Sequence, residues 1–189
     1  MLLMAVDIGN TNVVIGFIDD GRIAGTYRIT TKANHTSDEY GLMITQFLAL
    51  SGYKPADVDD VIISSVVPKV MHSFRASIVK FLDIDPMIVG PGIKTGLNIQ
   101  MENPAQIGSD LIVAAVAALS RFKPPLIIVD MGTATTMTAI DKNGTMKVVN
   151  SLFMLSAQSG FKVVALVAEE GTGAKPENGG SETSRPSED

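Results

Sequence analysis

The sequence lacks cysteine and tryptophan, and the only histidines among its 189 residues are His35 and His72. The absence of cysteine excludes a disulfide framework, a thiolate zinc site and a cysteine nucleophile. The two histidines are far apart in the sequence and do not suggest a metal cluster. Basic residues are also in deficit, with 15 Lys and Arg against 20 Asp and Glu and a formal net charge of -5. This balance disfavours a general nucleic-acid-binding protein, and we expect no nucleic-acid partner.

Long hydrophobic runs are absent as well. The longest apolar run covers Leu111 to Leu119, which is shorter than the roughly 17–25 residues that a membrane helix needs. The chain reaches Asp7 without the basic start and full apolar segment of a targeting peptide. We therefore expect a soluble, cytoplasmic protein with no membrane partner. Hydrophobic residues still make up 46% of the chain, which is enough for a packed core.

The charge is distributed unevenly along the chain. Residues 169–189 hold six acidic residues and two basic ones, so this segment carries -4 of the net -5. It is rich in Gly, Ser, Pro and Thr and offers no aliphatic anchor, so it cannot bury enough surface to offset its ordering entropy. We expect a disordered acidic tail, and an interaction tail is the alternative.

The hydrophobic pattern of residues 1–149 alternates between strands and helices. Thr36 followed by Glu39 is typical of a capping box and predicts the start of a helix. Further helices are expected after Pro68 and from Ser109, as its cap, to about Arg121. Apolar runs between turn residues predict strands at 2–6, 13–18, 23–29, 61–63, 87–89, 126–129, 135–140 and 145–149. This order of elements predicts an α/β layered fold.

An internal repeat carries the functional information. An apolar strand runs into Asp7-Ile8-Gly9-Asn10-Thr11, and a second runs into Asp130-Met131-Gly132-Thr133-Ala134-Thr135. A glycine lets the backbone approach a phosphate closely, and the N–H groups and hydroxyls that follow can point at it. An aspartate at the strand end can hold a cation or its water shell. Two such loops facing each other would clamp a nucleotide between two lobes.

Each of these features also has a simpler interpretation. Asp, Gly, Asn and Thr are ordinary turn residues, so each loop can be only a hairpin. Asp110 follows Ser109 in the first turn of a predicted helix, where an acid simply complements the helix dipole. The matched pair of loops favours the functional interpretation over the hairpin one.

Several segments together resemble the type III pantothenate kinases, members of the superfamily of actin, hexokinase and the chaperone ATPases. The resemblance covers roughly residues 1–149 and implies an α/β fold whose first part is a ribonuclease H-like, actin-like ATPase lobe, a mixed sheet with flanking helices. It implies lobe boundaries at residues 1–120 for the first lobe, with the phosphate loop, and 121–168 for the start of an incomplete second lobe, before the tail. The segments that carry it are 7–12, 36–40, 64–68, 92–97, 102–104 and 129–136.

The resemblance implies an enzyme, a kinase that phosphorylates pantothenate to 4'-phosphopantothenate with ATP in the first step of coenzyme A biosynthesis. It also implies Mg²⁺ with the ATP, a monovalent cation such as K⁺ or NH₄⁺, and a homodimer with the pantothenate site at its interface. Among site residues it implies Asp110 as the catalytic base and Asp130 as the ligand of the monovalent cation. Gly108, Ser109 and Asp110 would meet pantothenate. The ATP phosphates would contact Thr133 in the second lobe and, in the first, Asp7, Ile8, Gly9, Asn10, Thr11, Asn12, Val13 and Val14.

The sequence also departs from the family pattern. Leu111 stands where the family has an Arg, Met101 where a Tyr is common, and Thr138 where many members have an Asp. After Val149 the family's Gly-Gly and Pro-Gly motif does not follow, which suggests truncation, a shifted reading frame or a natural short variant. We therefore expect the chain to phosphorylate pantothenate poorly. A non-catalytic nucleotide-binding or regulatory relative is the main alternative, and a nucleotide-driven switch of the actin type is a third.

Overall fold

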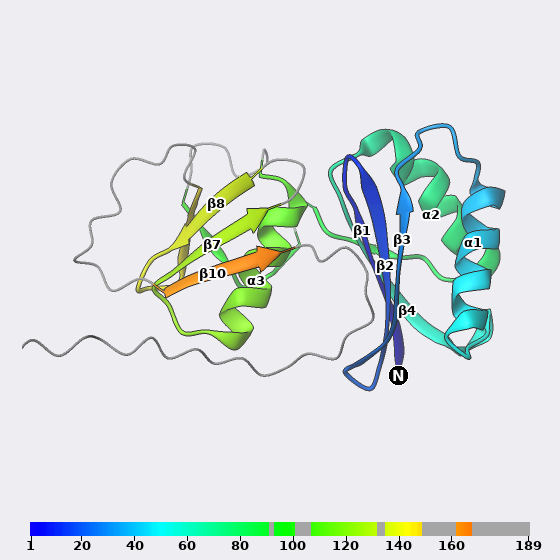
Figure 1. Cartoon of the computed structure of the whole chain (residues 1–189), viewed down its shortest axis with the longest axis horizontal. Helices are drawn as coiled ribbons and strands as arrows, with labels where there is room; N and C mark the ends of the chain where they lie inside the picture. The colour runs from blue at the N-terminus through cyan, green and yellow to red at the C-terminus, as the bar shows by residue number, and fades with distance from the viewer. Residues whose placement is uncertain (91–92, 101–106, 132–134, 149–161, 168–189) are drawn as a thin grey trace, which may run out of the picture.

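The computed structural model describes residues 1–90, 93–100, 107–131, 135–148 and 162–167. These residues form two five-stranded mixed sheets that lie side by side, with helices packed on them (Figure 1). Within these ranges no helix is both long and apolar enough to cross a membrane. The helices are α1 (Ser37–Leu50), α2 (Pro68–Leu82), α3 (Ser109–Arg121) and the short 3-10 helix η1 (Pro55–Asp57). The strands are β1 (Leu2–Ile8), β2 (Asn12–Asp19), β3 (Arg22–Thr30), β4 (Val58–Ser65), β5 (Met87–Ile88), β6 (Asn98–Ile99), β7 (Leu126–Met131), β8 (Thr135–Ile140), β9 (Thr145–Val148) and β10 (Lys162–Val167).

The first sheet has the strand order β3-β2-β1-β4-β5, with β1 antiparallel to β2 and parallel to β4. Side chains alternate between its two faces. On β1, Met4, Val6 and Ile8 are buried in a core that α1 and α2 complete. Ala5 and Asp7 therefore lie on the opposite face, which those helices do not cover. This alternation decides that Asp7 faces away from the core.

The predicted start of α1 is confirmed. Thr36 is the N-cap, its hydroxyl oxygen accepts the N–H of Glu39 at 3.2 Å, and the Glu39 carboxylate accepts the N–H of Thr36 at 2.7 Å. Two otherwise unpaired backbone donors at the helix start are satisfied in this way. The arrangement fixes the direction in which the chain leaves β3 and enters α1.

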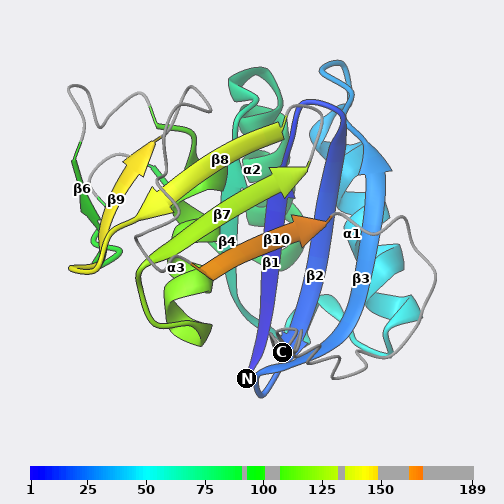
Figure 2. The same ribbon diagram turned by 60° about the vertical axis from the view of Figure 1, so that its left-hand side comes forward.

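The second sheet has the order β10-β7-β8-β9-β6 and repeats the plan of the first. Its strand β7 pairs antiparallel with β8 and parallel with β10, as β1 does with β2 and β4. Figure 2 shows β7 between β10 on one side and β8 on the other. The sequence predicted neither β10 nor the two-residue strand β6, because both are defined by partners distant in the sequence.

Helix α3 packs against the second sheet. Its small residues Ala115 and Ala118 share a core with Leu126, Ile128 and Ile140, joined by Met146. The sequence analysis placed the lobe boundary at residue 120, which assigns α3 to the first lobe. In the structure α3 contacts β4 of the first sheet as well as β7 and β8 of the second, because alanines at helical spacing let the helix backbone come close to the second sheet.

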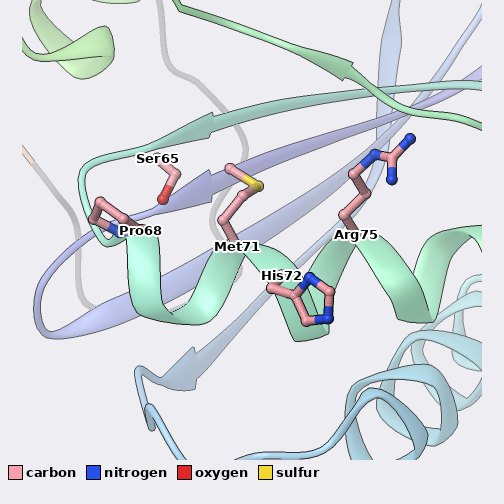
Figure 3. A pocket seen from close by; sticks show the side chains of 5 residues that line it. All are labelled: Ser65, Pro68, Met71, His72 and Arg75. Carbon is pink, nitrogen blue, oxygen red and sulfur yellow. The ribbon is translucent and has the colours of Figure 1, made fainter.

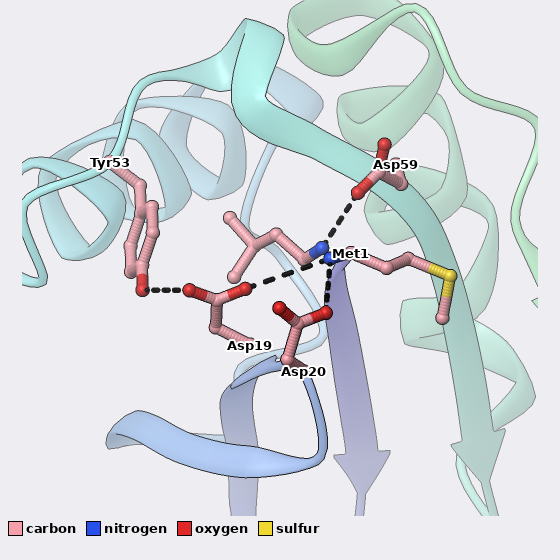
Figure 4. A network of polar contacts seen from close by, with 6 residues as sticks. Met1, Asp19, Asp20, Tyr53 and Asp59 are labelled. Atoms are coloured by element: carbon pink, nitrogen blue, oxygen red, sulfur yellow. Dashed lines mark hydrogen bonds and ion pairs between the residues drawn. The ribbon is translucent and has the colours of Figure 1, made fainter.

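A polar network fastens the beginning of β1 to its neighbours (Figure 4). The Met1 ammonium lies 2.7 Å from Asp20 Oδ1 and 3.8 Å from Asp19 Oδ1, and Asp59 accepts the Leu2 N–H at 2.7 Å. The Tyr53 hydroxyl donates to Asp19 at 3.0 Å. The contacts tie β1 to the β2–β3 turn and to β4 at the end of the strand opposite to Asp7.

Candidate functional site

A cleft of about 450 Å³ lies between the open face of the first sheet and α3. It is mostly apolar, and its wall on the sheet is made of small or short side chains such as Ala5, Val14 and Gly16. Three carboxylates from three different elements reach it, those of Asp7, Asp110 and Asp130. The described residues that line it include no Lys, Arg or His; the complete lining is Ala5, Val6, Asp7, Val14, Gly16, Ile62, Ser64, Val89, Asp110, Val113, Ala114, Ala117 and Asp130.

Asp7 enters the cleft from the end of β1. It pairs with Val14 on β2 and with Ser64 on β4, so it lies in the middle of the sheet. Burial against these strands raises the pKa of Asp7 above its usual value. A hydrogen bond from the Ser64 hydroxyl opposes this rise, and the carboxylates of Asp110 and Asp130 add to it. Among the described residues that line the cleft, Asp7 thus has like-charged neighbours and no Lys or Arg.

Asp110 and Asp130 come together because α3 and β7 run in opposite directions. Asp110 lies in the first turn of α3, and Asp130 lies near the end of β7, to which the chain returns. Burial raises the pKa of Asp130, and the Asp110 carboxylate raises it further. The two aspartates of the sequence repeat, Asp7 and Asp130, therefore line one cleft with the predicted base.

The position of Asp110 fits both interpretations of this residue, as an acid at a helix start and as a catalytic base. Its Oδ1 accepts the N–H of Leu111 at 2.9 Å, as expected for an acid at a helix start. The same carboxylate lines the cleft. Gly108, the N-cap, permits this, because a Cβ atom at that position would collide with Asp110 Oδ1. The conformation of Asp110 thus depends on the glycine two residues earlier.

The predicted phosphate loop is the tight turn between β1 and β2. The Gly9 N–H donates to the Asn12 carbonyl at 2.9 Å, so this amide serves the turn itself. A Cβ atom at Gly9 would come within 3.2 Å of the same carbonyl, which explains the glycine. Thr31 holds the turn from the end of β3: its hydroxyl donates to the Gly9 carbonyl at 2.7 Å and its N–H to the Thr11 carbonyl at 2.9 Å.

The other residues assigned to ATP occupy different positions. Asn10 and Thr11 are exposed at the tip of the turn, and Asn12 begins β2. Ile8 and Val13 are fully buried in the first core, so their side chains support the turn from behind. Val14 lines the cleft. Thr133 lies outside the described residues.

Ser109 is not the helix cap that the sequence predicted. Gly108 occupies the N-cap position and Ser109 is the first helical residue. The Ser109 side chain is buried and its hydroxyl contacts the end of β4, at 3.1 Å from Ser64 Oγ and 3.0 Å from the Ser65 carbonyl. The reason is long-range: β4 ends beside the start of α3 and presents polar groups that need partners.

The chemistry of the cleft suits a hard cation. Carboxylate oxygens are the donors that Mg²⁺ prefers, and a cation would oppose the burial and the like charge that raise the pKa values of Asp7 and Asp130. In the described ranges, no three acidic or histidine side chains are close enough to form a closed metal site. A cation held by these carboxylates would have to complete its coordination with water or with a phosphate ligand.

Leu111, which replaces the arginine of the family pattern, points elsewhere. It packs against the second core together with Ile107 and Ile99. It is absent from the lining of the cleft. At this position the chain gains apolar packing and supplies no charge for a carboxylate ligand. Met101 lies outside the described residues, and Thr138 is buried on β8.

Two further hollows lie near the cleft. One, of about 290 Å³, borders the Gly108–Ser109 segment and is lined also by Ser65, Val66, Val89, Gly90, Ile107 and Ile112. The other lies along α2, between Ser65, Pro68, Met71, His72 and Arg75 (Figure 3). In this second hollow Arg75 is already paired with Asp85 at 2.6 Å. Only the first hollow adjoins residues that the sequence assigned to a substrate.

Sequence reasoning missed Thr31 and assigned no role to the Ser64 side chain. Thr31 lies outside every resembling segment, and no local pattern links it to Gly9, from which it is separated by β2 and β3. Ser64 stood within the resembling segment 64–68, and its position after an apolar strand is the one available signal.

Comparison with known proteins gives relatives that share one description, type III pantothenate kinase. The protein from Bifidobacterium adolescentis is 69% identical over 177 residues, which is 94% of this chain and 67% of the relative. One from Bifidobacterium longum is 63% identical over 143 residues, covering 76% of this chain and 56% of the relative. One from Listeria monocytogenes is 45% identical over 143 residues, covering 76% of this chain and 55% of the relative. This chain therefore spans between about half and two thirds of the length of these relatives.

The alignment with the Bifidobacterium adolescentis protein must extend past residue 149, since it covers 94% of the chain. Among solved structures, a reductive activator for a corrinoid, iron-sulfur protein matches with a TM-score of 0.53 at 15% identity, over 76% of this chain and 30% of the other. At that identity the match supports the fold alone. The family model for type III pantothenate kinases matches residues 3–148, which hold both sheets as far as β9 and all three cleft aspartates. The fold, the repeated strand plan and these matches agree that the chain belongs to the type III pantothenate kinase family.

Proposed function

We propose that the protein transfers the γ-phosphoryl group of ATP to pantothenate, giving 4'-phosphopantothenate. The observation that carries this proposal is the convergence of Asp7, Asp110 and Asp130 on one cleft between the two sheets. Phosphoryl transfer requires mainly positioning and charge neutralisation, because its transition state is loose. A cleft whose described lining holds three carboxylates and no Lys, Arg or His suits a substrate that brings its own Mg²⁺.

The roles follow from the position of each group. The β1–β2 turn, with Asn10 and Thr11 exposed at its tip, lies next to Asp7 and contacts the phosphates. Asp7 and Asp130 face the cation that accompanies them. Asp110 accepts the proton of the attacking hydroxyl, which an ordinary carboxylate can do because that proton is lost late. Pantothenate then occupies the space beside the Gly108–Ser109 segment.

The cations and the assembly belong to the same proposal. Mg²⁺ supplies charge neutralisation for the phosphates, with Asp7 nearest to the phosphate loop. K⁺ or NH₄⁺ is assigned to Asp130, at the end of β7. The family's homodimer and a cytoplasmic location are proposed from the resemblance alone.

The test is a coupled assay of the purified protein with ATP, Mg²⁺, K⁺ and pantothenate, with product identified by mass spectrometry. Product that requires both Mg²⁺ and pantothenate supports the proposal. ATP hydrolysis that is indifferent to pantothenate contradicts it.

A second candidate is a non-catalytic relative that binds nucleotide. The position of Leu111 favours it, because a side chain packed in the second core cannot hold the pantothenate carboxylate. Isothermal titration separates the two candidates: Mg·ATP binding without pantothenate binding or turnover identifies the non-catalytic one.

A further inference from the structure

The start of α3 is joined to the end of β4 by a buried pair of hydroxyls. Ser64 and Ser109 are 6% and 7% exposed, and their Oγ atoms lie 3.1 Å apart. Ser109 Oγ also accepts the N–H of Ser65 at 3.1 Å and lies 3.0 Å from the Ser65 carbonyl, to which it can donate. A single side chain of α3 thus contacts three polar groups of a strand that is more than forty residues earlier in the sequence.

Each end of this hydroxyl pair adjoins a cleft carboxylate. Ser64 is the residue opposite Asp7 on the neighbouring strand β4, and both line the cleft. Ser109 immediately precedes Asp110 in the first turn of α3. The hydroxyl pair therefore ties the strand beside Asp7 to the helix that carries Asp110.

We propose that Ser64 and Ser109 are positioning residues that hold the predicted base Asp110 opposite Asp7. The proposal rests on the proposed function, since it concerns the geometry of the same cleft.

The first measurement is turnover. Ser109→Ala is expected to lower kcat about tenfold, the size of effect that the loss of a buried hydrogen bond gives, with KM for ATP within about twofold of the parent. Ser64→Ala should act similarly, and the double variant should be no worse than the more damaging single one, since both remove the same attachment. Losses that multiply, or a normal kcat in Ser109→Ala, overturn the proposal.

The control is Ser77→Ala. Ser77 is fully buried and donates to the Phe74 carbonyl at 2.6 Å within α2, outside the cleft lining. This variant should lose stability and keep kcat at temperatures well below its unfolding transition. A drop in kcat equal to that of Ser109→Ala would mean that any lost buried hydroxyl has this effect, and would also overturn the proposal.

The second measurement does not depend on kinase activity. The Ser65 amide, which donates to Ser109 Oγ, and the Ile112 amide, which donates to the Gly108 carbonyl, report on the attachment and on the first turn of α3. Both amides should exchange with solvent at least about tenfold faster in Ser109→Ala and at the parent rate in Ser77→Ala. Unchanged exchange overturns the proposal. If the parent protein shows no turnover at all, the proposed function fails and the exchange result alone decides whether the hydroxyl pair holds α3.

Discussion

Asp7 at the end of β1 and Asp110 at the start of α3 face the same cleft, and the charge of Asp110 raises the pKa of Asp7. They are brought together by the parallel pairing of β1 with β4 and by the attachment of α3 to the end of β4. Burial and neighbouring carboxylates both disfavour the ionised form of Asp7. This relationship gives the first prediction.

Asp7→Asn should stabilise the apo protein at neutral pH. The pKa of Asp7 is raised in the folded state, so the free energy of unfolding falls as the pH rises from the ordinary carboxyl value, ~3.9, through the folded value. Asparagine removes that loss, and the Tm difference should disappear below the ordinary carboxyl pKa. Thermal unfolding of the parent and of Asp7→Asn as a function of pH measures this difference in Tm.

Asp141→Asn is the matched control for this effect. The pKa of Asp141 is lowered, chiefly by the Thr145 N–H, so its charge contributes stability above the ordinary pKa. Its replacement should lower Tm at neutral pH. A fall in Tm for both variants would show that the charge of Asp7 does not destabilise the folded protein.

Thr31→Val should weaken Mg·ATP binding about fivefold, the effect of losing one neutral hydrogen bond. Valine keeps the shape of the side chain and removes the hydroxyl that holds the Gly9 carbonyl. Thr31→Ser keeps that hydroxyl and should bind as the parent does. Isothermal titration gives the dissociation constants, and equal weakening in both variants would contradict a role for the hydroxyl.

Leu111→Arg should lower stability by about 1–3 kcal/mol, because it places a charge where Leu111 now packs against the second core. Leu111→Met should cost less than ~1.5 kcal/mol. Urea unfolding measures both. If Leu111→Arg kept full stability and also lowered KM for pantothenate, residue 111 would have to face the substrate.

Mg·ATP should bind through the β1–β2 turn, and the Asp7→Ala, Thr11→Ala double variant should abolish the heat of binding. Asp7 supplies the nearby charge and Thr11 lies exposed at the tip of the turn. The titration is repeated without Mg²⁺, where the parent should also show little heat. Heat that persists unchanged in the double variant would place the nucleotide elsewhere.

The parts of the fold that local sequence specifies were predictable. Thr36 and Glu39 form the capping box that starts α1, and the alternation on β1 turns Asp7 away from the core. The repeated Asp-x-Gly pattern predicted two similar strand ends, and the structure shows that their strands β1 and β7 also have equivalent neighbours.

Long-range pairing was not predictable from local patterns. β10 is recognised as a strand only beside β7, and β6 only beside β9. Ser109 is typical of a helix cap, yet its hydroxyl is used by β4 because that strand ends at the same place. Leu111 could be recognised as a departure from the family pattern, but its packing in the second core depends on where α3 lies.

The central claim is that the cleft between the two sheets is the site of phosphoryl transfer. The most direct test is the rate of 4'-phosphopantothenate formation by the parent, by Asp110→Asn and by the control Asp141→Asn. Asparagine at 110 keeps an acceptor for the Leu111 N–H and removes the charge, so the helix start is preserved. We predict a loss of roughly 10²-fold or more in Asp110→Asn and a parent-like rate in Asp141→Asn. Parent-like turnover in Asp110→Asn, with its fold intact by circular dichroism, would contradict the account.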